Sequence, residues 1–250
     1  MGKDAPIDIL LKLMAPQVRD QTKLSLDLDE IQIIGEILNI EHLKVVTKEE
    51  WAAVSSSQSK NSYRSEIRSA IAHCLNAHSS HSDPNQSPSA FNTWAHLLDT
   101  GKLPVTEGWS ISISHCAHIG GFALAPAPHR LGFDIEDLER LKKKPDLIQR
   151  VATPNDLSQT PHLELLWSAK EALFKSLNSY PQTSPFRQPK TLSEVETTGW
   201  RHVSKKLEAQ LELFTFKGQN PKNAELIPGS GVVFIKSSLV YAFFNSFSST

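Results

Sequence analysis

Two carboxylates stand two positions apart in residues 132–136, which read Gly-Phe-Asp-Ile-Glu. In an extended strand, residues i and i+2 point to the same side, so Asp134 and Glu136 are expected to project together, about 6 to 7 Å apart. Like charges at this separation repel each other unless a cation or water lies between them, and hard oxygen ligands suit Mg²⁺. The pair predicts a candidate magnesium site, although an exposed polar strand face would explain the same spacing.

A second group of charged residues lies on a predicted helix over residues 163–177. Glu171 and Lys175 are four positions apart and therefore neighbours on one helix face. An ordinary surface pair of this kind would stabilise a helix by only about 0.2 to 0.5 kcal/mol. The helix is predicted from apolar residues that recur at 3.6-residue spacing: Leu163, Leu166, Leu173, Phe174 and Leu177.

Lys170 falls among these apolar residues by helical angle. A lysine on a core-facing surface must either extend to the rim or meet a carboxylate, because an unpaired buried charge is strongly unfavourable. Two further polar features precede the strand: Ser114-His115 closes the alternating run 110–114, and Lys102 lies in a Gly-Lys-Leu-Pro turn. Each is unremarkable alone, since a histidine at a strand end is usually structural or exposed.

Both helices and strands are expected to position these residues. A helix is expected over residues 63–75, and strands over 110–114 and 121–125, with a hairpin turn at Gly120-Gly121. Further strands are expected over 131–136, 211–216, 232–235 and 239–244, with turns at Asn220-Pro221 and Pro228-Gly229. The predicted fold class is α+β, with mixed sheets each covered by helices.

Charge and proline content divide the chain near Pro126 to Pro128. Residues 1–128 have a net charge of −4 and residues 129–250 a net charge of +3. Proline is poor inside regular structure, so the Ala-Pro-Ala-Pro segment at 125–128 suits a connection. We therefore expect two subdomains, an N-terminal one over 1–128 and a C-terminal one over 129–250 that carries the carboxylates.

The composition is that of an ordinary globular protein of 250 residues, 39% hydrophobic and 21% charged. A net charge of −1 argues against a general nucleic-acid binder. No apolar run reaches the roughly 18 to 20 residues that span a bilayer, and the first residues lack a signal-peptide pattern. The two cysteines, Cys74 and Cys116, fit neither a disulfide framework nor a zinc motif. We expect a cytoplasmic protein with both cysteines as packing residues.

The order of the blocks is more informative than any one of them. Gly-Lys-x-Pro, Ser-x-Ser-His, Gly-x-Asp-x-Glu and Trp-x-x-Lys-Glu-Ala-x-x-Lys follow one another along the chain. This order resembles the 4′-phosphopantetheinyl transferases, specifically the longer, monomeric, surfactin-synthetase-activating type. The resemblance covers Arg64 to Leu177 well and the flanks weakly. It implies two similar α+β subdomains in a pseudo-twofold arrangement, with coenzyme A in the cleft between them.

The resemblance also implies roles for individual residues. Asp134, Glu136 and Glu171 would hold Mg²⁺; Glu171 would also deprotonate the carrier serine, directly or through water. Lys175 would contact the pyrophosphate and protonate the leaving group. The positions that match contacts to coenzyme A phosphates are Arg64, Lys102, Ser114 and His115. Lys44, Lys48 and Lys60 are candidates for further basic contacts of the family.

The implied activity is that of a Mg²⁺-dependent holo-[acyl-carrier-protein] synthase, a monomer that converts apo acyl or peptidyl carrier proteins to the holo form. Carrier proteins are generally acidic near the modified serine, so a local basic patch is the expected docking site. The candidates are Arg140, Lys142, Lys143 and Lys144, directly after the carboxylates. Two alternatives stay open: a catalytically silent module that binds coenzyme A or carriers, and a two-carboxylate Mg²⁺ nucleotide hydrolase.

Overall fold

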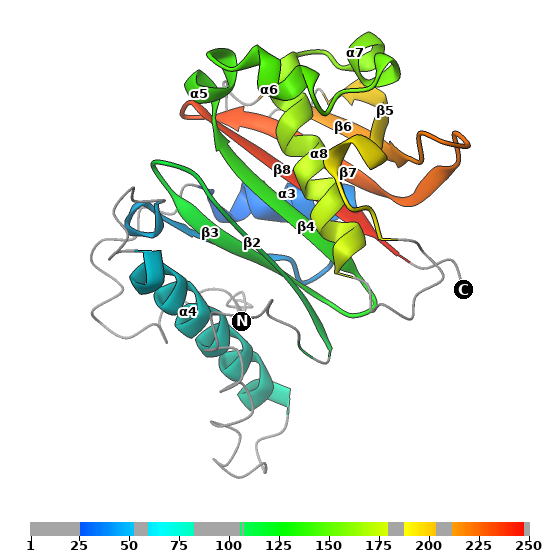
Figure 1. Ribbon diagram of the computed structural model, residues 1–250. Coiled ribbons are helices and arrows are strands. Elements are labelled where there is room, and N and C mark those ends of the chain that lie inside the picture. Colours follow the sequence, from blue (N-terminus) through cyan, green and yellow to red (C-terminus); the bar gives the residue numbers. More distant parts are fainter. Residues whose placement is uncertain are drawn as a thin grey trace.

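Two antiparallel β-sheets and the helices that cover them make up the computed structural model (Figure 1). It describes residues 26–52, 60–82, 106, 108–179, 188–203 and 212–247, with the side chains of 63–76 in the second range. The smaller sheet has the strand order β1-β3-β2 and the larger one β4-β8-β7-β6-β5. The α+β class is confirmed, but every strand pair is antiparallel rather than mixed.

The elements follow one another in a simple order along the chain. The strands are β1 (Lys44–Lys48), β2 (Trp109–His115), β3 (Gly120–Pro126), β4 (Arg130–Asp137), β5 (Glu196–His202), β6 (Glu212–Gln219), β7 (Leu226–Lys236) and β8 (Leu239–Ser246). The helices are α3 (Leu28–Leu38), α4 (Lys60–Ser82), α5 (Leu138–Lys142), α6 (Pro145–Gln149), α7 (Pro154–Gln159) and α8 (Leu163–Asn178), with 3-10 turns η1 (Glu49–Trp51) and η4 (Leu192–Glu194). None of the described helices is both long and apolar enough to cross a membrane.

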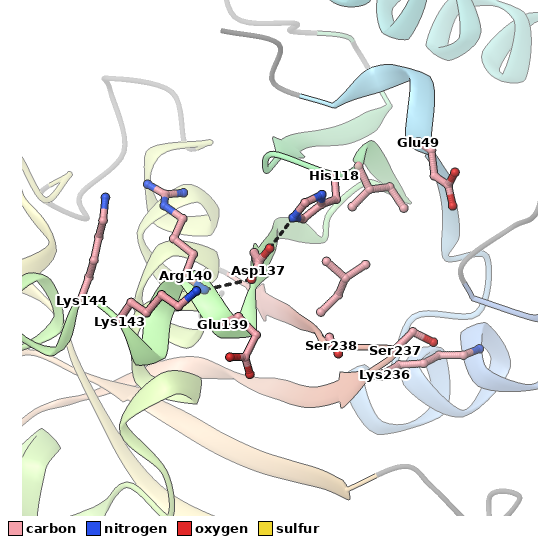
Figure 2. Close-up of a pocket in the computed structure, with 12 residues that line it drawn as sticks. Glu49, His118, Asp137, Glu139, Arg140, Lys143, Lys144, Lys236, Ser237 and Ser238 are labelled. Atoms are coloured by element: carbon pink, nitrogen blue, oxygen red, sulfur yellow. Dashed lines mark hydrogen bonds and ion pairs between the residues drawn. The ribbon is translucent and has the colours of Figure 1, made fainter.

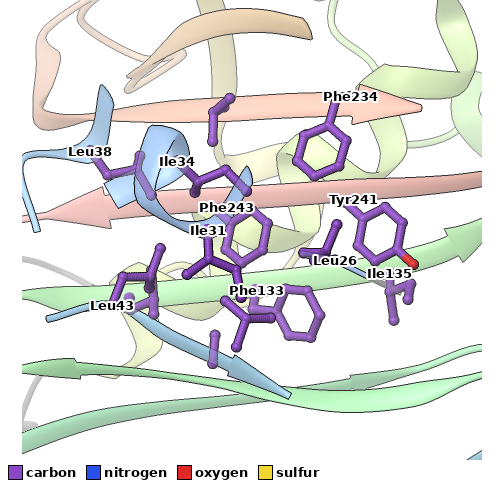
Figure 3. Close-up of a cluster of buried hydrophobic side chains, with 14 of the residues drawn as sticks. Leu26, Ile31, Ile34, Leu38, Leu43, Phe133, Ile135, Phe234, Tyr241 and Phe243 are labelled. Carbon is purple, nitrogen blue, oxygen red and sulfur yellow. The ribbon is translucent and has the colours of Figure 1, made fainter. Parts of the chain in front are cut away.

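The core is divided among three apolar clusters. One is shared by α3, the small sheet and one face of the large sheet, where Ile34, Phe133 and Phe243 are almost fully buried (Figure 3). A second lies between α8 and the opposite face of the large sheet, and a third between α4 and the small sheet. Alternation explains the division, since successive side chains of β8 point to opposite faces.

The chain passes from the small to the large sheet between β3 and β4, beside the expected boundary. Helix α3, from the first part of the chain, nevertheless packs against the large sheet. The division into residues 1–128 and 129–250 stays a prediction. Both cysteines are buried and unpaired, and burial raises the pKa of the Cys74 thiol to about 11.

Two expected turns are wrong, and each has a steric reason. The hairpin between β2 and β3 turns at residues 116–119, while Gly120 and Gly121 lie inside β3. A Cβ on Gly120 would lie 2.2 Å from the carbonyl oxygen of Trp51, so these glycines let η1 and β1 approach the strand. Pro228 and Gly229 lie inside β7, where a Cβ on Gly229 would meet the neighbouring strand β8.

Helix α8 lies against the large sheet through a glycine of β4. A Cβ on Gly132 would lie only 1.8 Å from the carbonyl oxygen of Ala172, so no other residue permits this approach. The buried face of α8 differs from the expected one, because Leu163 and Phe174 are only half-buried. Leu165, Ala169 and Ala172 are buried instead, because the helix turns these residues toward Gly132 and the sheet.

Lys170 pairs with a carboxylate, which is one of the two outcomes that its position on the apolar face predicts. Its ammonium pairs with Asp156 of α7, and both side chains are fully buried. Asp156 Oδ1 also accepts hydrogen bonds from the backbone N–H and the hydroxyl of Thr197 in β5, each 2.8 Å long. Burial is the main cause that lowers the pKa of Lys170, opposed by the Asp156 charge. The pair fixes α7, α8 and β5 relative to one another.

A row of three serines joins the two sheets. Strand β4 is an edge strand of the large sheet, so the N–H groups on its outer side find no partner strand. The serine row, buried side chains of β2, accepts them in order: Leu131 N–H to Ser110 Oγ at 2.8 Å, Phe133 N–H to Ser112 Oγ at 2.8 Å and Ile135 N–H to Ser114 Oγ at 3.2 Å. Strand β4 is thereby held against β2 without a continuous sheet.

We expect Ser110→Ala to lower the free energy of unfolding by about 1 to 3 kcal/mol, because the buried Leu131 N–H loses its acceptor. Urea titration followed by circular dichroism measures the change. The control is Ser158→Ala on α7, whose exposed hydroxyl donates to the Asn155 carbonyl, and which should change stability by less than about 0.5 kcal/mol. Equal effects in the two variants would contradict a structural role for the serine row.

Candidate active site

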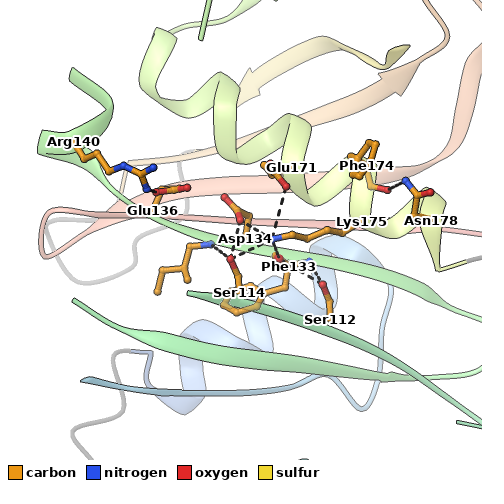
Figure 4. A network of polar contacts seen from close by, with 11 residues as sticks. Ser112, Ser114, Phe133, Asp134, Glu136, Arg140, Glu171, Phe174, Lys175 and Asn178 are labelled. Atoms are coloured by element: carbon orange, nitrogen blue, oxygen red, sulfur yellow. Dashed lines mark hydrogen bonds and ion pairs between the residues drawn. The ribbon is translucent and has the colours of Figure 1, made fainter. Parts of the chain in front are cut away.

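Residues from three distant parts of the sequence meet where β2, β4 and α8 come together (Figure 4). Ser114 comes from the end of β2, Asp134 from the middle of β4 and Lys175 from the last turns of α8. The serine row places β2 beside β4, and Gly132 lets α8 approach β4 from the other face. The structure therefore brings together three blocks that the sequence presents separately.

Asp134 is the most buried carboxylate of the group, with 3% of its surface exposed. Its Oδ1 accepts a hydrogen bond from the Ser114 hydroxyl at 2.8 Å and one from the Lys175 ammonium at 2.7 Å. Its Oδ2 is buried and has no hydrogen-bond partner among the described residues. A buried carboxylate oxygen without a partner is energetically unfavourable and indicates a position for a further cation or donor.

The Lys175 ammonium has more partners than its ion pair with Asp134. Besides Asp134, its ammonium donates to Ser114 Oγ and to the carbonyl oxygen of Phe133, both at 3.2 Å. Glu171 Oε2 lies 4.0 Å from the same nitrogen, at the outer limit of an ion pair. Glu171 and Lys175 therefore lie on one face of α8, as their i, i+4 spacing predicts.

The two glutamates of the group, Glu136 and Glu171, both have raised pKa values. Burial, with the Asp134 charge second, raises the pKa of Glu136 to about 7, although Arg140 and Lys175 oppose the shift. Arg140 Nη1 lies 3.0 Å from Glu136 Oε2. Burial also raises the pKa of Glu171, with Lys175 opposing and Asp134 reinforcing the shift. Burial is the largest cause of both shifts, so the site favours proton uptake by these two carboxylates unless a further cation compensates them.

The donor set fits a hard divalent cation. Asp134, Glu136 and Glu171 offer carboxylate oxygens, the ligands that Mg²⁺ prefers, and Asp134 Oδ2 is free. Among residues whose side chains are described, no three ligand side chains are gathered closely enough to form a complete metal centre. Mg²⁺ is commonly bound through one or two carboxylates plus substrate phosphates, so an incomplete protein cage is compatible with this ion.

His115 lies on the other side of Ser114, against helix α4. The Tyr63 hydroxyl is 3.1 Å from its Nε2, and the two rings are in contact. Burial lowers the pKa of His115, and the charges of Lys175 and Arg64 lower it further. The lowered pKa favours the neutral imidazole at neutral pH. Sequence reasoning missed Tyr63, because nothing in its spacing points to a residue 52 positions away.

The remaining basic residues are placed differently. Arg64 is exposed on α4 and acts on His115 through its charge. Lys102 and the side chain of Lys60 lie outside the described residues. Lys44 lies over the Trp109 ring and Lys48 over the Trp51 ring, at 5.6 and 5.5 Å from the ring centres. These two ammonium groups contact the aromatic rings of a β2 residue and an η1 residue.

A pocket of about 1130 Å³ opens beside the carboxylates, past the end of β4 (Figure 2). Asp137, the residue after Glu136, lies in its wall and pairs with His118 of the β2–β3 turn at 2.6 Å. The remaining lining comes from η1, the β7–β8 turn and the α5–α6 segment, which contributes Lys143 and Lys144. The pocket lies next to the Asp134 site and does not enclose it.

The four residues of the basic run differ in their pairing. Arg140 pairs with Glu136, and Lys142 Nζ lies 2.9 Å from Glu139 Oε1. Lys143 and Lys144 form no ion pair with any described residue. Both nevertheless line the pocket, so the uncompensated positive charge of the run lies at its wall.

Comparison with known proteins finds one family that matches part of the chain. Residues 130–226 match the model of the 4′-phosphopantetheinyl transferase superfamily. No curated protein matches the chain significantly. The matched segment begins with β4, includes α8 and contains Asp134, Glu136, Glu171 and Lys175, whereas Ser114 and His115 precede it. The part of the chain that carries the carboxylates and the lysine is therefore the part that is similar to the 4′-phosphopantetheinyl transferase superfamily.

Proposed function

We propose that the protein transfers the 4′-phosphopantetheine arm of coenzyme A to a serine of an apo acyl or peptidyl carrier protein. The observation that supports this most directly is the meeting of Ser114, Asp134 and Lys175 at one point, with Asp134 Oδ2 left free. Transfer from a pyrophosphate requires positive charge near the leaving phosphate and a base near the attacking hydroxyl. Lys175 and Glu171 supply these two functions within one helix face.

In the proposed reaction, the carrier serine oxygen attacks the phosphorus that bears the pantetheine arm. The new P–O bond forms as the bond to adenosine 3′,5′-bisphosphate breaks. Glu171, whose raised pKa favours proton uptake, accepts the serine proton. Lys175 neutralises or protonates the departing phosphate. Bound Mg²⁺, held by Asp134, Glu136 and Glu171, would supply charge stabilisation on the pyrophosphate.

His115, Arg64 and Lys102 are proposed to hold the coenzyme A phosphates. Support comes from the two of these that the structure describes, since Arg64 lies close enough to lower the pKa of His115. Tyr63 holds the imidazole in place from the helix side. The surfactin-synthetase-activating type, the monomeric state and the cytoplasmic location expected from the sequence stay predictions.

The central prediction is that wild-type protein with coenzyme A and Mg²⁺ adds a phosphopantetheine arm to apo carrier proteins. We expect Glu171→Gln to reduce turnover by about 10²- to 10⁴-fold, because the base is lost. Mass spectrometry of a panel of apo carriers measures the product. Glu164→Gln, at the first turn of the same helix, is the matched control and should retain turnover. Wild-type binding of coenzyme A without any modified serine would favour the silent binding module instead.

The histidine generates a prediction about pH. Its pKa is lowered in the free protein, and a bound phosphate would raise it, so coenzyme A binding favours the protonated imidazole. The contribution of His115 to affinity is therefore complete at or below the free pKa and is lost as pH rises through the bound pKa. Calorimetric titration of wild type and His115→Gln between pH 5 and 8 isolates this term by difference. Parallel profiles in the two proteins would exclude His115 from phosphate binding.

The basic run yields a prediction about carrier docking. Because Arg140 and Lys142 are paired within the protein, we propose that Lys143 and Lys144 attract the acidic carrier. Lys143→Glu with Lys144→Glu should raise the KM for the carrier several-fold, more at low than at high salt, with unchanged affinity for coenzyme A. Lys142→Glu is the matched control and should have a smaller effect. An unchanged carrier KM at low ionic strength would leave this patch without a docking role.

A further inference from the structure

The ammonium of Lys175 has no hydrogen left for a substrate. A lysine ammonium carries three donors. All three are used within the protein, by Asp134 Oδ1, Ser114 Oγ and the Phe133 carbonyl oxygen. Contact between Lys175 and a pyrophosphate, as the proposed function requires, therefore demands that at least one of these bonds be given up.

Ser114 is saturated in the same way. Its hydroxyl donates to Asp134 Oδ1, and its oxygen accepts from the Ile135 N–H and from Lys175. A hydroxyl has one donor and two acceptor positions, so none is left over. Ser114 therefore holds Asp134 Oδ1 beside Lys175, and Oδ2 is left without a hydrogen-bond partner among the described residues. The hydrogen-bonding groups of Lys175 and Ser114 are thus satisfied without any ligand, whereas Asp134 Oδ2 is not.

The position of the ammonium has an electrostatic consequence. It lies 2.7 Å from Asp134 Oδ1 and neutralises a carboxylate whose side chain is only 4% exposed. A divalent cation on the same carboxylate would be repelled by this nearby positive charge. The Lys175 side chain is 27% exposed, so unlike Asp134 it is accessible to an incoming anion.

We propose that Lys175 is an internal counter-ion that occupies Asp134 until the pyrophosphate of coenzyme A draws it away, so that coenzyme A and the divalent cation bind with positive coupling. This inference rests on the proposed function for the identity of the anion. In this exchange, Asp134 loses its ion pair with Lys175 and binds the divalent cation. Lys175 in turn leaves Asp134 and pairs with the pyrophosphate. By linkage, each ligand strengthens binding of the other by the same factor.

The test measures metal binding directly, with Mn²⁺ as the probe and no carrier present. Electron paramagnetic resonance determines the Kd of Mn²⁺ for the protein with and without saturating coenzyme A, after subtraction of Mn²⁺ bound by coenzyme A in solution. For wild type we expect coenzyme A to tighten Mn²⁺ binding by about tenfold or more. Equal Mn²⁺ affinity with and without coenzyme A would overturn the proposal.

Variants separate the lysine from the phosphates as the source of coupling. Lys175→Met should bind Mn²⁺ more tightly than wild type without coenzyme A, and the coupling factor should fall correspondingly. Lys175→Arg keeps the charge and should stay close to wild type. Lys217→Met, which removes an ammonium that donates to the Gly229 carbonyl away from the site, is the matched control.

A coupling factor in Lys175→Met as large as in wild type would assign the effect to the coenzyme A phosphates alone and overturn the proposal. Circular dichroism checks the fold, and Lys175→Gln replaces the methionine variant if that protein does not fold. The experiment also separates this inference from the proposed function. Arm transfer without Mn²⁺ coupling would refute only the exchange of Lys175, whereas coupling without arm transfer would refute only the transferase activity.

Discussion

The serine row of β2 is the interaction on which the site depends. An edge strand presents unpaired N–H groups, and in β4 these are satisfied by side-chain hydroxyls instead of a neighbouring strand. Because the acceptors are serine hydroxyls of β2, this strand lies directly beside β4, and its residue Ser114 contacts Asp134. The same contact that satisfies the sheet edge therefore positions the hydroxyl that donates to Asp134.

Gly132 supplies the complementary constraint from the other face of β4. Because no side chain separates the strand from α8, the backbone of the helix approaches close enough for Lys175 to reach Asp134 and the Phe133 carbonyl. The glycine and the carboxylates of the Gly-x-Asp-x-Glu block thus have separate tasks. Gly132 permits the approach of α8, and the carboxylates interact with the charged residues that this approach brings near. A larger residue at 132 would displace Glu171 and Lys175 together.

Sequence patterns predicted the local parts of this arrangement and not its long-range contacts. Alternation located β2 and β4, and helical spacing located α8, because both depend on neighbours within a few residues. Spacing could not distinguish a turn from a close strand approach at Gly120-Gly121, nor identify Tyr63 as the partner of His115. The serine row was visible as alternating polar residues. Its partners, in another sheet, follow only from the tertiary fold.

Two lysines five positions apart on α8 show how burial decides whether an ion pair is permanent. Lys170 is fully buried, and both oxygens of its partner Asp156 accept hydrogen bonds from threonines, one that caps α7 and one in β5, as well as from the ammonium. Nothing can replace the lysine there without leaving a buried charge unpaired. Lys175 is partly exposed, and its partner Asp134 keeps one oxygen free. An incoming cation can therefore compensate Asp134 when Lys175 moves, and this makes one pair structural and the other exchangeable.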